Sequence, residues 1–181
     1  TMEMERSPVI VVMGHIDHGK STLLDYIRKT NVVEREAGGI TQRVSAYEIS
    51  HNQKNITFID TPGHEAFSAM REQGAAAADI AILVVSVEDG VKLQTLEAKT
   101  VIEKNHLPYI VAINKIDKPT ANLEWTKRNL VENGIYIEGL GGQVPWAAIS
   151  AKTGQGVPEL LDLILLVAEL TELKKDDARP A

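Results

Sequence analysis

Residues 14–21 of this chain read GHIDHGKS, and this segment limits the possible folds more than any other part of the sequence. It fits the pattern G-x-x-x-x-G-K-[ST], follows an apolar run at residues 9–13 and precedes a helical pattern at residues 20–29. The backbone N–H groups of such a loop, together with the helix N-terminus, can surround a polyphosphate. The alternative is a chance glycine turn before a helix, which we expect in about one random chain in a hundred or fewer. The strand, loop and helix context favours a phosphate-binding loop.

The rest of the chain repeats this alternation of apolar runs and helical patterns, which is typical of a parallel α/β sheet. A length of 181 residues suits one domain. The patterns predict six strands, at residues 9–13, 44–50, 56–59, 80–87, 109–113 and 146–149. They predict helices at residues 20–29, 64–78, 93–105, 123–133 and 158–173, with an irregular loop at 31–43. We therefore expect an extension at residues 1–7, the domain at 8–173 and a charged tail at 174–181.

Composition excludes several classes of protein. Hydrophobic residues make up 44% of the chain, which argues against disorder, and the absence of cysteine excludes disulfides and thiolate metal sites. The net charge of −6 disfavours a free-standing nucleic-acid binder. The N-terminus lacks an apolar signal segment and the apolar runs are too short to span a bilayer, so we expect a cytoplasmic or organelle-matrix location. Because the first residue is Thr1 and not methionine, we expect the chain to be part of something longer.

In the first motif, the Lys20 ammonium can contact β- and γ-phosphate oxygens and the Ser21 hydroxyl can bind Mg²⁺. A second motif, DTPGH at residues 60–64, follows a predicted strand. Asp60 could reach Mg²⁺ through a water molecule, and the Gly63 N–H could contact a γ-phosphate. The alternative is ordinary turn chemistry. The nucleotide-binding residues expected in these two motifs, and directly after the first, are Asp17, His18, Gly19, Lys20, Ser21, Thr22 and Gly63.

Two further residues have a functional and an ordinary interpretation. His64 could orient an attacking water molecule, or it could be a solvated histidine in the first turn of a helix. Thr41 could complete the Mg²⁺ ligands when a γ-phosphate is present, or it could be an ordinary loop threonine. The residues themselves leave both alternatives open.

Two motifs near the end of the chain suit guanine. Residues 114–117 read NKID, and the Asp117 carboxylate can accept from both the ring N–H and the exocyclic amine of guanine, a donor pair that adenine lacks. The Lys115 stem can cover the base, whereas Asn114 would mainly brace neighbouring loops. The alternative is a polar capping loop before Pro119. A second motif supplies backbone N–H groups for the base carbonyl, from Ser150, Ala151 and Lys152.

The order and the sequences of these motifs resemble those of the G domains of translational GTPases. The resemblance covers about residue 6 to residue 173. Two segments, AGGITQ at residues 37–42 and DTPGHEAF at residues 60–67, narrow the resemblance. They are similar to translation initiation factor two of bacteria and organelles, and to its archaeal and eukaryotic relative, initiation factor five B. Two positions depart from the pattern: Arg43 stands where the family usually has histidine, and Lys152 where relatives often have leucine.

The resemblance implies an α/β fold, a Ras-like P-loop G domain with a six-stranded, mostly parallel sheet and helices on both faces. It implies hydrolysis of GTP to GDP and phosphate, slow for the domain alone and stimulated by the ribosome. In that family His64 would position the attacking water, Ser21 and Thr41 would bind Mg²⁺, and Asp17 with Gly39 would hold K⁺ or Na⁺. Initiator tRNA would be bound only through other domains of a monomeric factor. The alternatives are another translational GTPase, a non-hydrolysing nucleotide-dependent binding module, and an ATPase, which Asp117 opposes.

Overall fold

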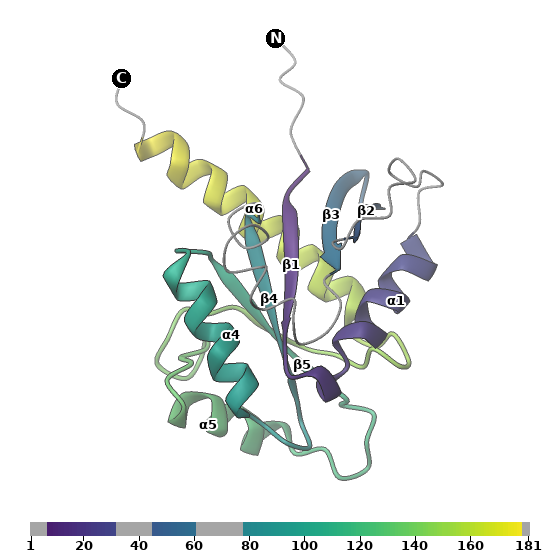
Figure 1. The fold of residues 1–181 in the computed structure, drawn as a ribbon, viewed down its shortest axis with the longest axis vertical. Helices are drawn as coiled ribbons and strands as arrows, with labels where there is room; N and C mark the ends of the chain where they lie inside the picture. The colour runs from purple at the N-terminus through teal and green to yellow at the C-terminus, as the bar shows by residue number, and fades with distance from the viewer. Residues whose placement is uncertain (1–6, 32–44, 61–77, 179–181) are drawn as a thin grey trace.

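The computed structural model describes residues 7–31, 45–60 and 78–178 of the chain (Figure 1). Its centre is a six-stranded sheet with the strand order β2-β3-β1-β4-β5-β6. Only β2 and β3 run antiparallel, so the sheet is mixed and mostly parallel, as predicted. The strands are β1 (Val9–Gly14), β2 (Ser45–His51), β3 (Lys54–Asp60), β4 (Ile80–Ser86), β5 (Tyr109–Asn114) and β6 (Trp146–Ala148).

The inner strands β1, β4 and β5 are buried along nearly their whole length. Their sequences, VIVVMG, IAILVVS and YIVAIN, are almost continuous apolar runs, because a parallel strand that is covered on both faces has no side that needs polar residues. Their parallel registers bring the last residues of these strands, Gly14, Ser86 and Asn114, to the same edge of the sheet. Loops that follow these strands therefore meet at that edge.

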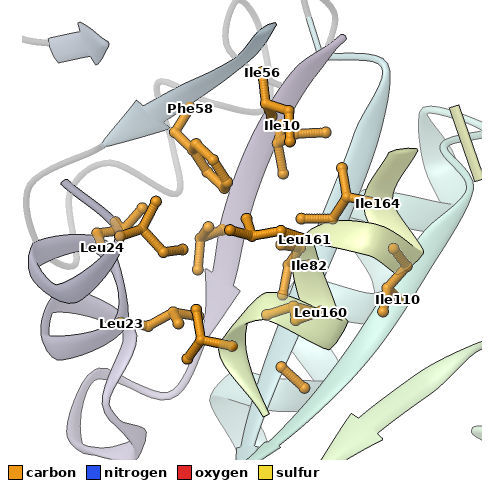
Figure 2. Close-up of a cluster of buried hydrophobic side chains, with 14 of the residues drawn as sticks. Ile10, Leu23, Leu24, Ile56, Phe58, Ile82, Ile110, Leu160, Leu161 and Ile164 are labelled. Atoms are coloured by element: carbon orange, nitrogen blue, oxygen red, sulfur yellow. The ribbon is translucent and has the colours of Figure 1, made fainter. Parts of the chain in front are cut away.

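Helices cover both faces of the sheet (Figure 1). Helices α1 and α6 pack on one face, where their leucine and isoleucine side chains meet Ile10, Phe58 and Ile82 of the strands (Figure 2). Helices α4 and α5 pack on the opposite face. The helices are α1 (Lys20–Asn31), α4 (Leu93–Lys104), α5 (Leu123–Glu132) and α6 (Val157–Ala178), preceded by the 3₁₀ turn η1 (Ile16–His18).

Strand and helix boundaries agree with the sequence-based prediction within one or two residues, except at the end of α6. This helix continues to Ala178, five residues beyond the predicted end. The added sequence, KKDDA, contains lysine and alanine, which favour helix, and two aspartates, which do not. Strand β3 begins at Lys54 because Asn52 and Gln53 both have positive φ and close a tight hairpin that pairs His51 with Lys54. The predicted helix at 64–78 and the predicted loop at 31–43 lie almost entirely outside the described residues.

The β2–β3 hairpin is fixed to α6 at its turn. The His51 Nε2 atom lies 2.7 Å from Asp162 Oδ1, and the Asn52 side-chain amide donates to the same oxygen at 2.8 Å. The His51 side chain is largely covered and joins the hairpin to α6. Within the part of the chain that the structure describes, no helix is both long and apolar enough to cross a membrane.

The core beneath α6 provides a test of this packing. Leu160 is fully buried between α6 and the sheet, whereas Leu166 on the same helix is 51% exposed. Leu160→Ala should lower the free energy of unfolding by about 2–5 kcal/mol, because it removes buried methyl groups and leaves a cavity. Leu166→Ala, the same change at an exposed position, should alter it by less than about 0.5 kcal/mol. Urea unfolding of both variants measures the difference, and equal effects would contradict the packing of α6.

Candidate functional site

The loop between β1 and α1 forms the first wall of the site. Gly14 has a φ of 142°, and a Cβ there would collide with the Val84 carbonyl of β4. Gly19 has a φ of 97°, and a Cβ there would overlap the Asn114 amide. Between them the chain makes a single 3₁₀ turn in which the His18 N–H donates to the His15 carbonyl at 3.0 Å. The two glycines thus allow the loop to approach both β4 and β5 closely.

Helix α1 begins directly after this loop, so its N-terminus lies at the same edge of the sheet as the loop. Its first turn is Lys20-Ser21-Thr22-Leu23, which contains no carboxylate that would compete for the unpaired backbone N–H groups. The positive end of the helix dipole therefore favours an anion here. The Lys20 side chain is nearly buried, whereas Ser21 and Thr22 are exposed.

Asn114, the last residue of β5, links the two halves of the site. Its side-chain amide donates to the His18 carbonyl at 2.8 Å, and its side-chain oxygen accepts from the Ala151 N–H at 2.9 Å. The residue is almost completely buried, so both hydrogen bonds are shielded from water. The bracing role predicted for Asn114 is confirmed, and its contribution to ligand binding stays a prediction.

Lys115 follows Asn114 in a left-handed conformation, with a φ of 68°. This backbone turn directs the side chain back over the first loop, where Nζ donates to the Asp17 carbonyl at 2.8 Å. Nζ also lies 3.8 Å from Glu88 Oε1. The aliphatic stem of Lys115 therefore runs along the border between the phosphate loop and residues 114–117.

Asp117 and Ser150 form a pair across this end of the site. The Ser150 hydroxyl donates to Asp117 Oδ1 at 2.8 Å, and its oxygen lies 3.2 Å from the Thr153 N–H. The hydrogen bond from Ser150, with a smaller effect of the Lys152 charge, lowers the pKa of Asp117. Asp117 is exposed and therefore presents an ionised, oriented carboxylate to solvent.

The sequence motifs assigned Ser150 only through its backbone N–H. The structure adds the hydroxyl, which orients the Asp117 carboxylate. The serine at position 150 is the feature of the sequence that could have indicated this contact, because alanine would supply the same backbone N–H but no hydroxyl.

His18 has an environment that the motif did not indicate. Its imidazole is fully buried, stacks on the His15 ring with 4.6 Å between centroids, and places Nε2 3.3 Å from Asp89 Oδ2. Burial lowers the pKa of His18 to about 4, and the charges of His15 and Lys115 act in the same direction while Asp89 opposes them. The ring is therefore neutral at physiological pH.

Several predicted site residues lie outside the described residues, namely Gly39, Thr41, Gly63 and His64. The backbone of Asp60 ends β3, where it pairs with Ser45, but its side chain is outside the description. The structure therefore brings together the phosphate loop and both base motifs, whereas the assignments to catalysis and to Mg²⁺ stay predictions. Within residues 7–31, 45–60 and 78–178, no group of three or more acidic, histidine or cysteine side chains is placed to hold a metal ion.

Comparison with known sequences finds one family and many relatives. The family model for the elongation factor Tu GTP-binding domain matches residues 5–169. Translation initiation factor IF-2 of a Nitratiruptor species is 58% identical over 177 residues, which is 98% of this chain and 21% of that protein. IF-2 of Bacillus pumilus is 54% identical over 176 residues, 97% of this chain and 25% of that protein. The chain thus spans about a quarter of the length of these relatives.

Solved structures agree with the sequence comparison. GDP-bound aIF5B from Aeropyrum pernix has a TM-score of 0.70 and 34% identity, over 97% of this chain and 38% of that one. Translation elongation factor SelB from Methanococcus maripaludis, in complex with the GTP analogue GppNHp, has a TM-score of 0.69 and 31% identity, over 91% of this chain and 34% of that one. These likenesses support the mixed six-stranded fold described above.

The lowered pKa of His18 makes the stability of the ligand-free protein depend on pH. The unfolded histidine takes up a proton near pH 6.5 and the folded one only near pH 4, so lowering the pH through this window favours unfolding. From this group alone we expect a loss of about 2 kcal/mol of unfolding free energy between pH 7.5 and pH 5. Urea unfolding across this range measures the loss. His18→Gln removes the titrating ring and should show a shallower pH dependence, and identical slopes would contradict the assignment.

Proposed function

Since the chain belongs to the family of the elongation factor Tu GTP-binding domain, we propose that it is the GTP-binding and GTP-hydrolysing domain of a translation initiation factor. One observation supports the assignment of a nucleotide site most directly. The Asn114 side chain holds the phosphate loop, through His18, and the loop at residues 150–152, through Ala151, as one unit. Identities of 54–58% to IF-2 proteins over nearly the whole chain favour initiation over other translational roles.

Guanine selectivity would come from Asp117. Its carboxylate is ionised, held by Ser150 and exposed at the edge of the site. Such a group can accept two hydrogen bonds from the N1–H and the amine of guanine. With adenine the same carboxylate would lack this donor pair, which disfavours ATP. Lys115, whose Nζ donates to the Asp17 carbonyl, would cover one face of the base with its stem.

Phosphates would bind against residues 14–21 and the N-terminus of α1. The Lys20 ammonium would neutralise β- and γ-phosphate charge and stabilise the charge that develops during hydrolysis. The exposed Ser21 hydroxyl at the start of α1 is a hard oxygen donor, which fits Mg²⁺. The proposed Mg²⁺ ligands are Ser21 and Thr41, with Asp60 through a water molecule; when bound, the ion would supply charge neutralisation at the phosphates.

Hydrolysis would consist of in-line attack by water on the γ-phosphate, which breaks the bond to the β-phosphate oxygen and gives GDP and phosphate. We assign His64 to the orientation of this water molecule, and the Gly63 N–H to contact with the γ-phosphate. Asp17, an exposed acidic residue in an anion-binding loop, would hold K⁺ or Na⁺ together with the backbone near Gly39.

The wider role belongs to the full-length factor. We propose that the factor works on the ribosome, in the cytoplasm or an organelle matrix, in subunit joining and in placing initiator tRNA. Regions of the relatives beyond the part matched by this chain would bind the tRNA, and this domain would supply the nucleotide-dependent switch.

Asp117→Asn provides the main test of the guanine site. The amide should donate to the 2-carbonyl of xanthine where the carboxylate accepted from the guanine amine. By calorimetry we expect wild type to bind GDP and not ATP, and the variant to lose about a hundredfold or more in GDP affinity while gaining XDP binding. Asp25→Asn, the same chemical change on the exposed face of α1, should bind GDP like wild type. Unchanged GDP preference in Asp117→Asn would remove Asp117 from the site.

His64→Ala tests hydrolysis separately from binding. An interaction made only in the transition state affects the rate and leaves ground-state affinity unchanged. We therefore expect nearly wild-type GTP and GDP affinity for the variant. Single-turnover hydrolysis by the full-length factor on ribosomes should be at least about tenfold slower, because loss of a group that positions a reacting proton slows a reaction by this much or more. A wild-type rate on ribosomes would make His64 a structural histidine.

A further inference from the structure

The segment between β4 and α4, residues 87–92, contacts both halves of the nucleotide site although no nucleotide motif includes it; we call it the β4–α4 loop. The Val87 N–H donates to the Asn114 carbonyl at 3.0 Å. Glu88 Oε1 lies 3.8 Å from Lys115 Nζ, and Asp89 Oδ2 lies 3.3 Å from His18 Nε2. Two adjacent carboxylates thus face the base side and the phosphate side of the site.

The β4–α4 loop is itself held by the helix α5 and by its own turn. The Val91 N–H donates to Asn129 Oδ1 at 2.7 Å, and the Thr126 hydroxyl donates to the Val87 carbonyl at 3.3 Å. Ser86 closes the turn: its carbonyl accepts from the Gly90 N–H at 2.9 Å. The loop therefore presents the Asp89 carboxylate from a fixed backbone.

The side chain next to the Asp89 carboxylate is the imidazole of His18. Its imidazole is fully buried, and neither ring nitrogen has a hydrogen-bond partner among the described residues. A buried N–H without an acceptor costs free energy. The 3.3 Å contact with Asp89 lacks hydrogen-bond geometry, but the Asp89 side chain is 44% exposed and has room to rotate. A small rotation would let Asp89 accept from Nε2–H and fix the tautomer of the ring.

We propose that Asp89 is a positioning residue of the nucleotide site: it accepts from His18 Nε2–H and thereby holds the phosphate loop in its binding conformation. His18 is then held from two sides, by Asp89 at the side chain and by Asn114 at the carbonyl, where the hydrogen bond is 2.8 Å long. This support would keep the loop in the conformation seen here, in which the His18 N–H donates to the His15 carbonyl and the Asp17 N–H to His15 Nδ1. The inference rests on the proposed function, since it requires that nucleotide binds at residues 14–21.

A purely electrostatic role for Asp89 predicts the opposite effect of its removal on nucleotide affinity. A carboxylate beside an anion site repels phosphates, so a purely electrostatic residue would weaken binding and its removal would tighten it. A positioning residue does the reverse, because loss of the acceptor frees the His18 ring and loosens the loop. Asp89→Asn separates these effects, because it removes the negative charge while its amide oxygen can still accept from Nε2–H.

The experiment measures dissociation of fluorescent mant-GDP by stopped flow from wild type, Asp89→Ala, Asp89→Asn and the control Glu97→Gln. Glu97 is an exposed residue of α4, and its substitution removes one negative charge as Asp89→Asn does. We expect release about three- to tenfold faster for Asp89→Ala, the range of one lost hydrogen bond, and within about twofold of wild type for Asp89→Asn and Glu97→Gln.

Nuclear magnetic resonance of the GDP-bound wild type gives a readout that needs no variant. The ¹⁵N shifts of His18 should show a neutral ring protonated on Nε2, and Asp89→Ala should change them while Glu97→Gln should not. Release from Asp89→Ala at or below the wild-type rate, or a ring protonated on Nδ1, would overturn the inference while the wild-type site stands. Failure of the wild type to bind mant-GDP would overturn the proposed function and this inference with it.

Discussion

The two hydrogen bonds of the Asn114 side chain connect the parts of the site that the fold brings together. The parallel registers of β1, β4 and β5 only place the loops at one edge of the sheet. Asn114 then ties the His18 carbonyl to the Ala151 N–H across that edge. Because the amide is buried, loss of either partner would leave an unpaired polar group without water to replace it. A single side chain therefore joins the phosphate loop directly to residues 150–152.

Much of this arrangement follows from the sequence, because the features concerned are local. Apolar runs of strand length and the glycines of the first motif are read directly from the chain, and the inner strands appear within one residue of the predicted bounds. The alternation of strands and helices also predicted the parallel sheet, and the resemblance to known G domains predicted the helices on both faces. Because each motif directly follows a parallel strand, the sequence also placed residues 14–21, 114–117 and 150–152 at one edge of the sheet.

Other features depend on contacts between distant residues, and the sequence did not reveal them. The hydroxyl of Ser150 meets Asp117 only because Ile149 pairs with the end of β5, where the Ile149 N–H donates to the Ile113 carbonyl at 2.7 Å. The environment of His18 depends on the position of Asp89, which is far away in the chain. The continuation of α6 to Ala178 differs from the predicted end at residue 173. The added sequence KKDDA is ambiguous, because lysine and alanine favour helix whereas aspartate does not.

Lys115 shows that this site stores conformational strain. A φ of 68° is unfavourable for a residue with a side chain and costs about 1–2 kcal/mol compared with the right-handed region. The 2.8 Å hydrogen bond from Nζ to the Asp17 carbonyl offsets part of that cost. A glycine would adopt the same backbone without strain but could not reach Asp17. At this position the most relaxed backbone and the best-supported phosphate loop require different residues, and the lysine in this chain favours the loop at the expense of the backbone.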